Sequence, residues 1–97
     1  MAQRPIKLGP RDAEAVALHA LAHVAADESL LERFVALTGC GGDDFRRRVN
    51  DPCFLGAVLD FVLEDGDQTV LAVAQAAGIA PEGMVAVRAM LPGAGEW

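Results

Sequence analysis

The chain contains the same helix–glycine–turn–helix unit twice, and this repeat limits how the chain can fold. One copy spans residues 31–46 and the other spans residues 70–85. Their central glycines, Gly39 and Gly78, lie 39 positions apart, and each follows a small residue and precedes an apolar one. Glycine can end a helix in the left-handed conformation because it has no Cβ. We therefore expect two corners between helices, and the unit resembles a DNA-binding helix-turn-helix.

Helical periodicity and capping residues predict six helices. Asp27, Asp51 (or Asn50) and Asp67 are expected N-caps, because their side chains can accept hydrogen bonds from the first free backbone amides. Residues 43–49 are acidic at their start and basic at their end, which suits the helix dipole. No segment alternates with period two for long enough to form a strand. The predicted helices span residues 10–26, 29–38, 43–49, 52–64, 68–77 and 81–91.

The helix predicted at residues 52–64 is apolar almost all round, which is typical of a central, buried helix. Gly56, Asp60 and Glu64 are four positions apart, so they are expected to form its one solvent-facing seam. The fold class is therefore all-α, a compact orthogonal bundle of five or six short helices with helix 52–64 central. The 97 residues suit one domain at 10–91, with flexible segments at 1–9 and 92–97.

Apolar residues at helical spacing predict which side chains face the core. The expected inward-facing residues are Ala13, Ala17, Leu21 and Val24; then Leu30, Phe34 and Leu37; then Phe45 and Val49; then Val70, Val73, Ala74 and Ala77; and finally Met84, Val87 and Leu91.

Several segments of the chain resemble a family of short bacterial proteins, domain of unknown function 3572. The segments that carry the resemblance are Phe54–Leu63, Asp12–Ala15, Leu37–Gly39, Ala77–Ile79 and the pair Glu96–Trp97. The resemblance covers nearly the whole chain and implies a small helical domain. The family brings no activity, substrate or catalytic residue that could be transferred to this sequence.

Composition excludes several classes of protein. The formal net charge of -6 argues against a general nucleic-acid binder, because phosphate would be repelled at long range. Two cysteines do not make a disulfide-rich secreted scaffold, and no apolar run is long enough to span a bilayer. We expect a cytoplasmic protein.

His19 and His23 lie one helical turn apart, a spacing that can chelate zinc or nickel. They lie opposite the apolar face of helix 10–26, so a solvated helix surface is the simpler interpretation, and no metal or other cofactor is expected. Cys40 and Cys53 lack the C-x-x-C spacing of zinc and redox sites. Both are interpreted as small hydrophobic residues.

The one basic cluster is Arg46, Arg47 and Arg48, which could meet phosphate or an acidic partner. It could equally compensate Asp43 and Asp44 at the other end of its own short helix. Helix 81–91 carries Arg88 as its only positive charge, whereas base recognition needs several Arg, Lys, Asn or Gln side chains. DNA binding by a helix-turn-helix regulator is therefore the alternative hypothesis.

The leading hypothesis is a non-enzymatic protein-interaction module or homodimer. The sequence has no phosphate-binding loop, no nucleophile elbow and no carboxylate pair in a recognisable cleft. Nothing in it therefore indicates an enzyme or a small-molecule substrate. The last two helices carry aliphatic residues, Leu71, Val85 and Met90, that a small domain cannot easily bury, and such surface is typical of interfaces. Trp97 is a further candidate contact, together with the three arginines.

Overall fold

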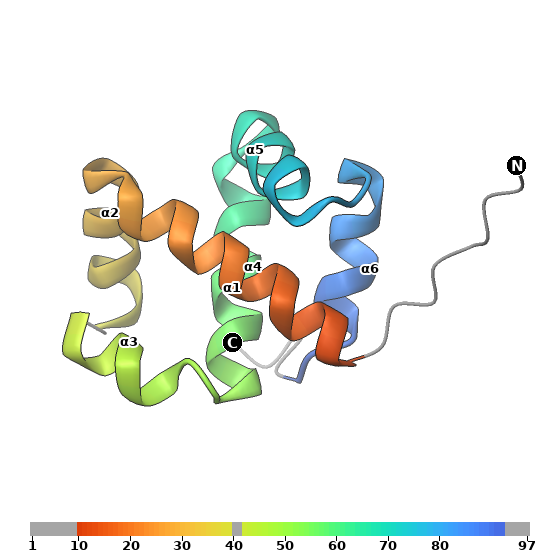
Figure 1. Ribbon diagram of the computed structural model, residues 1–97. Helices are drawn as coiled ribbons and strands as arrows, with labels where there is room; N and C mark the ends of the chain where they lie inside the picture. Colours follow the sequence, from red (N-terminus) through yellow and green to blue (C-terminus); the bar gives the residue numbers. More distant parts are fainter. Residues whose placement is uncertain (1–9, 40–41, 93–97) are drawn as a thin grey trace, which may run out of the picture.

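The computed structural model describes residues 10–39 and 42–92, and all regular elements within these ranges are helices (Figure 1). The all-α bundle predicted from the sequence is confirmed. Helix bounds agree with the predicted ones to within one residue, except at the last helix. The elements are α1 Pro10–Ala26, α2 Glu28–Thr38, α3 Gly42–Arg48, α4 Pro52–Asp65, α5 Asp67–Ala77, the 3-10 turn η1 Pro81–Gly83 and α6 Met84–Ala89.

Helix α4 is the centre of the bundle, as predicted. It packs against α1, α5 and α6, and α1 crosses it diagonally in Figure 1. Half of its length is buried, including Phe54, Leu55, Val58, Leu59 and Val62. Burial of such side chains contributes about 1.5–3 kcal/mol each relative to full exposure, so α4 supplies much of the driving force for folding.

Helix α1 packs closely because its inner face is built from small residues. Ala13, Ala17 and Ala20 are completely buried, and Val24 continues the same face. Alanine side chains allow two helix backbones to approach, which explains how α1 contacts both α4 and α5. The inward face predicted for residues 10–26 is confirmed.

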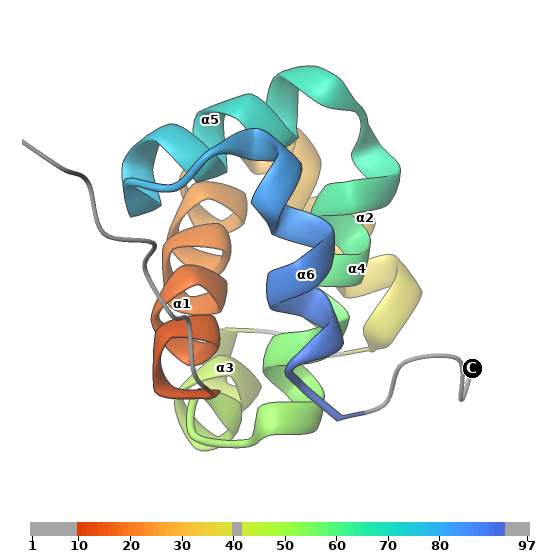
Figure 2. The same ribbon diagram turned by 90° about the vertical axis from the view of Figure 1, so that its right-hand side faces the viewer.

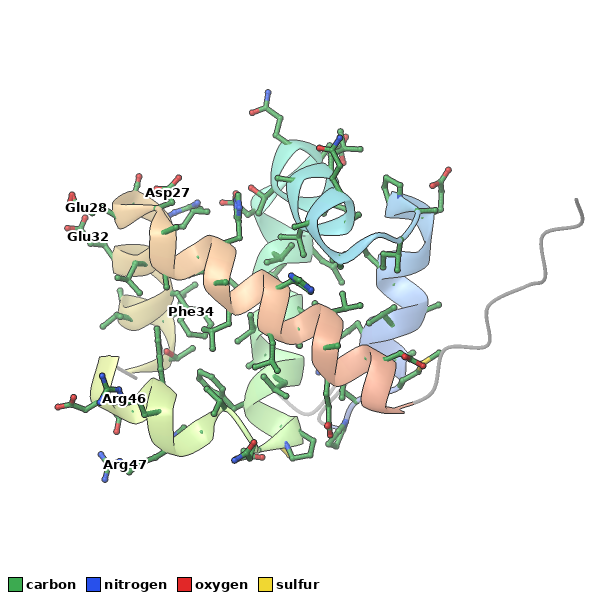
Figure 3. The ribbon with its side chains drawn as sticks, in the orientation of Figure 1. Asp27, Glu28, Glu32, Phe34, Arg46 and Arg47 are labelled. Carbon is green, nitrogen blue, oxygen red and sulfur yellow. The ribbon has the colours of Figure 1, made fainter. Side chains whose placement is uncertain are left out.

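Four phenylalanines from α2, α3 and α4 form the second part of the core. The Phe34 ring lies edge-on to the rings of Phe45, Phe54 and Phe61, with centroid distances of 5.7, 5.9 and 5.3 Å. Figure 3 shows Phe34 pointing from α2 into the bundle. These are all the aromatic residues of the chain except Trp97, which lies outside the described residues.

Local signals set the helix ends at most positions. Asp27 accepts hydrogen bonds from the amides of Ser29 and Leu30, at 3.0 and 3.3 Å, and Asp51 accepts one from the amide of Cys53 at 2.9 Å. Gly39 and Gly78 end α2 and α5 with φ of 73° and 74°, in the left-handed conformation. Both corners are therefore confirmed.

The cap predicted at Asp67 is wrong. Asp67 is the first residue of α5, and the N-cap position is Gly66, which offers no side-chain hydrogen bond. Helix α5 begins one residue earlier than predicted, so Asp67 lies inside its first turn. The carboxylate of Asp67 therefore stabilises this turn only through the helix dipole.

Helix α2 differs from the prediction in one respect. Leu30 and Phe34 are buried, but Leu37 is 73% exposed. Helix α2 packs chiefly against α1, whose direction diverges from it (Figure 1), so the last turn of α2 extends beyond the core. Val49 of the α3 segment packs against the core only partly.

Candidate interaction surfaces

Exposed apolar residues lie on α5, on α6 and on the segment between the two helices. Leu71 is 52% exposed and Val85 is 66% exposed. Leu71 is one of the residues that line a shallow hollow, together with Gln75, Ile79 and Pro81. Leu71 and Gln75 are one turn apart on α5, and Pro81 and Val85 are four positions apart across η1 and α6. We call these five residues the α5–α6 face; Figure 2 shows how α5 and α6 lie relative to each other.

Met90 and Trp97 were also predicted as interaction contacts. Met90 is half-buried and packs against the core, so the expectation that it is an exposed aliphatic residue is wrong. The chain turns back toward α4 immediately after α6, and this turn draws Met90 inward. Trp97 lies outside the described residues, as do Cys40 and the segments at 1–9 and 93–97.

The three arginines of α3 are exposed. Arg47 Nη2 lies 2.8 Å from Asp44 Oδ1 within the same helix, the local compensation that the sequence suggested. Figure 3 shows Arg46 and Arg47 at the outer edge of α3, on the side of the molecule where Asp27, Glu28 and Glu32 surround the start of α2. The basic cluster therefore shares its side of the molecule with an acidic one.

Arg88 is the largest departure from the sequence interpretation, because it is buried rather than displayed. Its side chain is 5% exposed. Its Nε and Nη2 donate to Oδ1 and Oδ2 of Asp60, at 2.6 and 3.0 Å, in a bidentate pair. Its Nη1 donates to the carbonyl oxygens of Leu91 and Pro92, at 3.0 and 3.1 Å. The only cation of α6 thus holds the end of α6 against α4.

The solvent-facing seam predicted on α4 is consequently wrong for two of its three residues. Gly56 is buried and Asp60 is half-buried, whereas Glu64 is exposed. Helix α6 returns over this face of α4. A Cβ at Gly56 would lie 2.8 Å from both Arg88 Nη1 and the Pro92 carbonyl oxygen, so glycine is what allows the approach.

The arginine also changes the end of the last helix, predicted at residue 91. The α-helical part stops at Ala89, and Met90 and Leu91 continue as tight turns bonded to Val87 and Arg88. Because the Arg88 side chain caps the carbonyls of Leu91 and Pro92, the backbone there does not need to continue as helix.

Among the described residues, the candidates His19, His23 and Cys53 do not form a metal site. His19 is exposed and His23 is half-buried, and no group of three or more His, Cys, Asp or Glu side chains in the described ranges is arranged to hold a metal ion. Cys53 is exposed, so its interpretation as a buried hydrophobic residue is wrong. It lies in the first turn of α4, where Phe54 and Leu55 take the inward directions.

A polar cluster lies where α2, α4 and α5 meet. Arg33 Nη2 and Thr69 Oγ1 both bond to the carboxylate of Asp65, and the guanidinium carbon of Arg33 lies 5.6 Å from the centroid of the Phe61 ring. The hydrogen bond from Thr69 lowers the pKa of Asp65 below its ordinary value, and Arg33 and His23 act in the same direction while burial opposes them.

Asp65 is expected to make stability depend on pH in the acid range. Because its pKa is lower in the folded than in the unfolded chain, its contribution is present above the unfolded value, about 3.9, and is lost as pH falls through the folded value. In urea unfolding, Asp65→Asn should have a lower free energy of unfolding than wild type near pH 7. This difference should disappear toward pH 2. Glu32→Gln, on an exposed residue in the middle of α2, is the control. A deficit that does not change with pH would contradict the assignment.

No single helix within residues 10–39 and 42–92 is long and apolar enough to cross a membrane; α5 and residues 81–89 reach that length only together, across a bend of 98°.

Fold and surfaces together define a class: a small all-α bundle around one buried helix, with two glycine corners and an exposed apolar face. The family described as Protein of unknown function (DUF3572) matches residues 10–94, and the chain belongs to this family. The resemblance seen in the sequence is thereby confirmed. No curated protein and no solved structure matches the chain.

Proposed function

We propose that this protein is a non-enzymatic interaction module that forms a homodimer through the α5–α6 face. The observation that carries the proposal is the exposure of Leu71, which lines the hollow, and of Val85, which lies four positions after the lining residue Pro81. Exposed apolar side chains that cluster, rather than occurring singly, are typical of interfaces. Leu71 lies on α5 and Val85 on α6, and α5 meets the last helical segment at a bend of 98°.

The distribution of charge supports a second copy of this chain as the partner. A protein of net charge -6 repels its own copies unless the contact surface is nearly neutral. Between Gln68 and Leu91 the only charged residues are Glu82 and Arg88, and Arg88 is directed into the protein. Glu82 is therefore the one exposed charge on this part of the chain, and the face can meet itself with little repulsion.

Sedimentation or light scattering over a concentration series tests the proposal. The wild-type protein should dimerise, and Val85→Asp should raise the dimer dissociation constant by at least about tenfold, or 1.4 kcal/mol. Leu18→Asp is the matched control, because Leu18 is 43% exposed on α1, a helix that contributes no residue to this face. A wild-type protein that stays monomeric up to about 1 mM, a dissociation constant worth only about 4 kcal/mol, would overturn the proposal. So would equal effects of the two substitutions.

A DNA-binding regulator remains the second candidate, favoured by one observation. The 98° bend falls within the range of about 90–120° typical of a helix-turn-helix. Against it, the exposed positions Val85, Ala86 and Ala89 of α6 offer no donor for bases, and Arg88 is buried. Duplex-DNA binding at low salt that is abolished by charge reversal of Arg46, Arg47 and Arg48 would support this candidate; no binding at low salt would remove it.

A further inference from the structure

A second apolar surface lies between α2 and α4, away from the α5–α6 face. The two helices make few direct backbone contacts and are bridged by the ring of Phe34. On the outer side of that ring is a hollow of about 330 Å³. Phe34, Ala57 and Phe61 contribute its apolar lining, and Leu37 lies at its edge.

A smaller hollow of about 240 Å³ continues this one toward the start of α4, where it reaches Cys53 and Phe54. The two share Leu37, Thr38 and Ala57, so they form one groove, which we call the α2–α4 groove. At 1.5 Å per residue, its α4 wall from Cys53 to Glu64 is about 17 Å long, the length of roughly three helical turns. Its dimensions therefore suit a short helix laid along α4.

Leu37 gives the groove an apolar contact that the domain itself does not use. It is 73% exposed, the highest value among the large apolar side chains of the described residues. Leu37 lines both hollows, so a helix bound in the groove would cover the whole leucine side chain. Burying an exposed leucine in this way is favourable, because apolar surface is removed from water.

The charges around the groove select the kind of helix. In the larger hollow the only charged lining residues are acidic, Asp60 and Glu64. Asp60 pairs with Arg88, and Glu64 is exposed. Arg33, the one cation of α2, is paired with Asp65. In the smaller hollow Arg48 and Asp51 balance.

We infer that the α2–α4 groove binds a basic amphipathic helix of a partner protein. The apolar stripe of that helix packs on Leu37, Ala57 and Phe61, and a Lys or Arg beside the stripe faces Glu64. This is the helix-in-groove mode of recognition, in which anchors recur at helical spacing. The inference deepens the proposed interaction role but uses a surface that the homodimer leaves open.

A titration with two synthetic helices tests the inference. One is a three-turn amphipathic peptide of leucine and lysine, and the other replaces each lysine with glutamate. Chemical shifts of the full-length, isotope-labelled protein report where each peptide binds. The leucine–lysine peptide should shift residues of α2 and α4, and the glutamate peptide should bind at least about tenfold more weakly, a difference of 1.4 kcal/mol.

Matched substitutions localise the effect. Leu37→Asp should weaken binding about tenfold or more, whereas Leu18→Asp should not. Glu64→Lys should weaken it, whereas Glu82→Lys, with the same change in net charge, should leave it nearly unchanged. All four substituted side chains are exposed, so the four variants should retain wild-type circular dichroism.

If something other than a basic partner helix occupies the α2–α4 groove, these experiments give different results. Val85→Asp must still bind the leucine–lysine peptide, which separates this inference from failure of the homodimer. The inference is overturned if both peptides bind equally, if the shifts fall on α5 and α6, or if Leu37→Asp abolishes self-association. It is also overturned if Leu37→Asp alters the emission of Trp97 without peptide, because the chain would then fill its own groove.

Discussion

Arg88→Ala is expected to lower the free energy of unfolding by about 3–5 kcal/mol, the cost typical of breaking a buried ion pair by removing one partner. Four hydrogen bonds are lost at once, two to Asp60 and one each to the carbonyls of Leu91 and Pro92. The half-buried carboxylate of Asp60 loses its bidentate cation, and the end of α6 loses its attachment to α4. Urea unfolding followed by far-ultraviolet circular dichroism measures the difference.

The exposed pair supplies the control for this prediction. Arg47→Ala removes an ion pair of similar distance, but one whose arginine is 75% exposed, so it should change stability by less than about 1 kcal/mol. A double-mutant cycle of Arg88→Ala with Asp60→Ala should show that the two effects are not additive. If Arg88→Ala costs no more than Arg47→Ala, the buried pair does not hold the fold. A folded Arg88→Ala protein that had lost DNA binding would instead favour the helix-turn-helix hypothesis.

Phe34→Ala is expected to cost about 3–5 kcal/mol, the range for removing a buried aromatic side chain. Phe34 is completely buried, and its ring contacts three others, so the substitution leaves a cavity bounded by rigid rings. Small domains have total stabilities of only about 5–15 kcal/mol. The variant should therefore unfold at a much lower urea concentration than wild type.

The neighbouring Leu37 makes a matched control, since it is one turn away on the same helix. Leu37→Ala should change stability by no more than about 0.5 kcal/mol, because its side chain is mostly in solvent. Phe34→Leu, which keeps most of the volume, covers the case in which Phe34→Ala does not fold. Equal effects of Phe34→Leu and Leu37→Ala would show that α2 is not anchored by its aromatic residue.

The helices were predictable because their signals are local. Asp27 and Asp51 lie within three residues of the amides they accept from, and Gly39 and Gly78 act on the turn immediately before them. The apolar spacing of α1 and the nearly continuous apolar character of α4 identify their buried sides for the same reason. The exposed apolar residues Leu71 and Val85 were also anticipated, because the last two helices carry more aliphatic residues than a small domain can easily bury.

The surfaces were only partly predictable. Leu37 has the spacing of a core residue, and its exposure depends on where the neighbouring helices end. Cys53 is exposed because two larger residues after it take the inward directions. The spacing of Gly56 and Asp60 predicts a solvent-facing seam, but α6 covers both residues. No pattern within α4 indicates that α6 packs there.

The sequence by itself determined the class of fold, most of the helix ends, the two glycine corners and the burial of α4, because caps, left-handed glycines and apolar periodicity act over a few residues. It also determined the family to which the chain belongs. The tertiary structure alone decided that Arg88 points inward to Asp60, 28 residues away, and that Leu37 edges an open groove. Both depend on which face of one helix meets another, and that is settled only when the whole bundle packs.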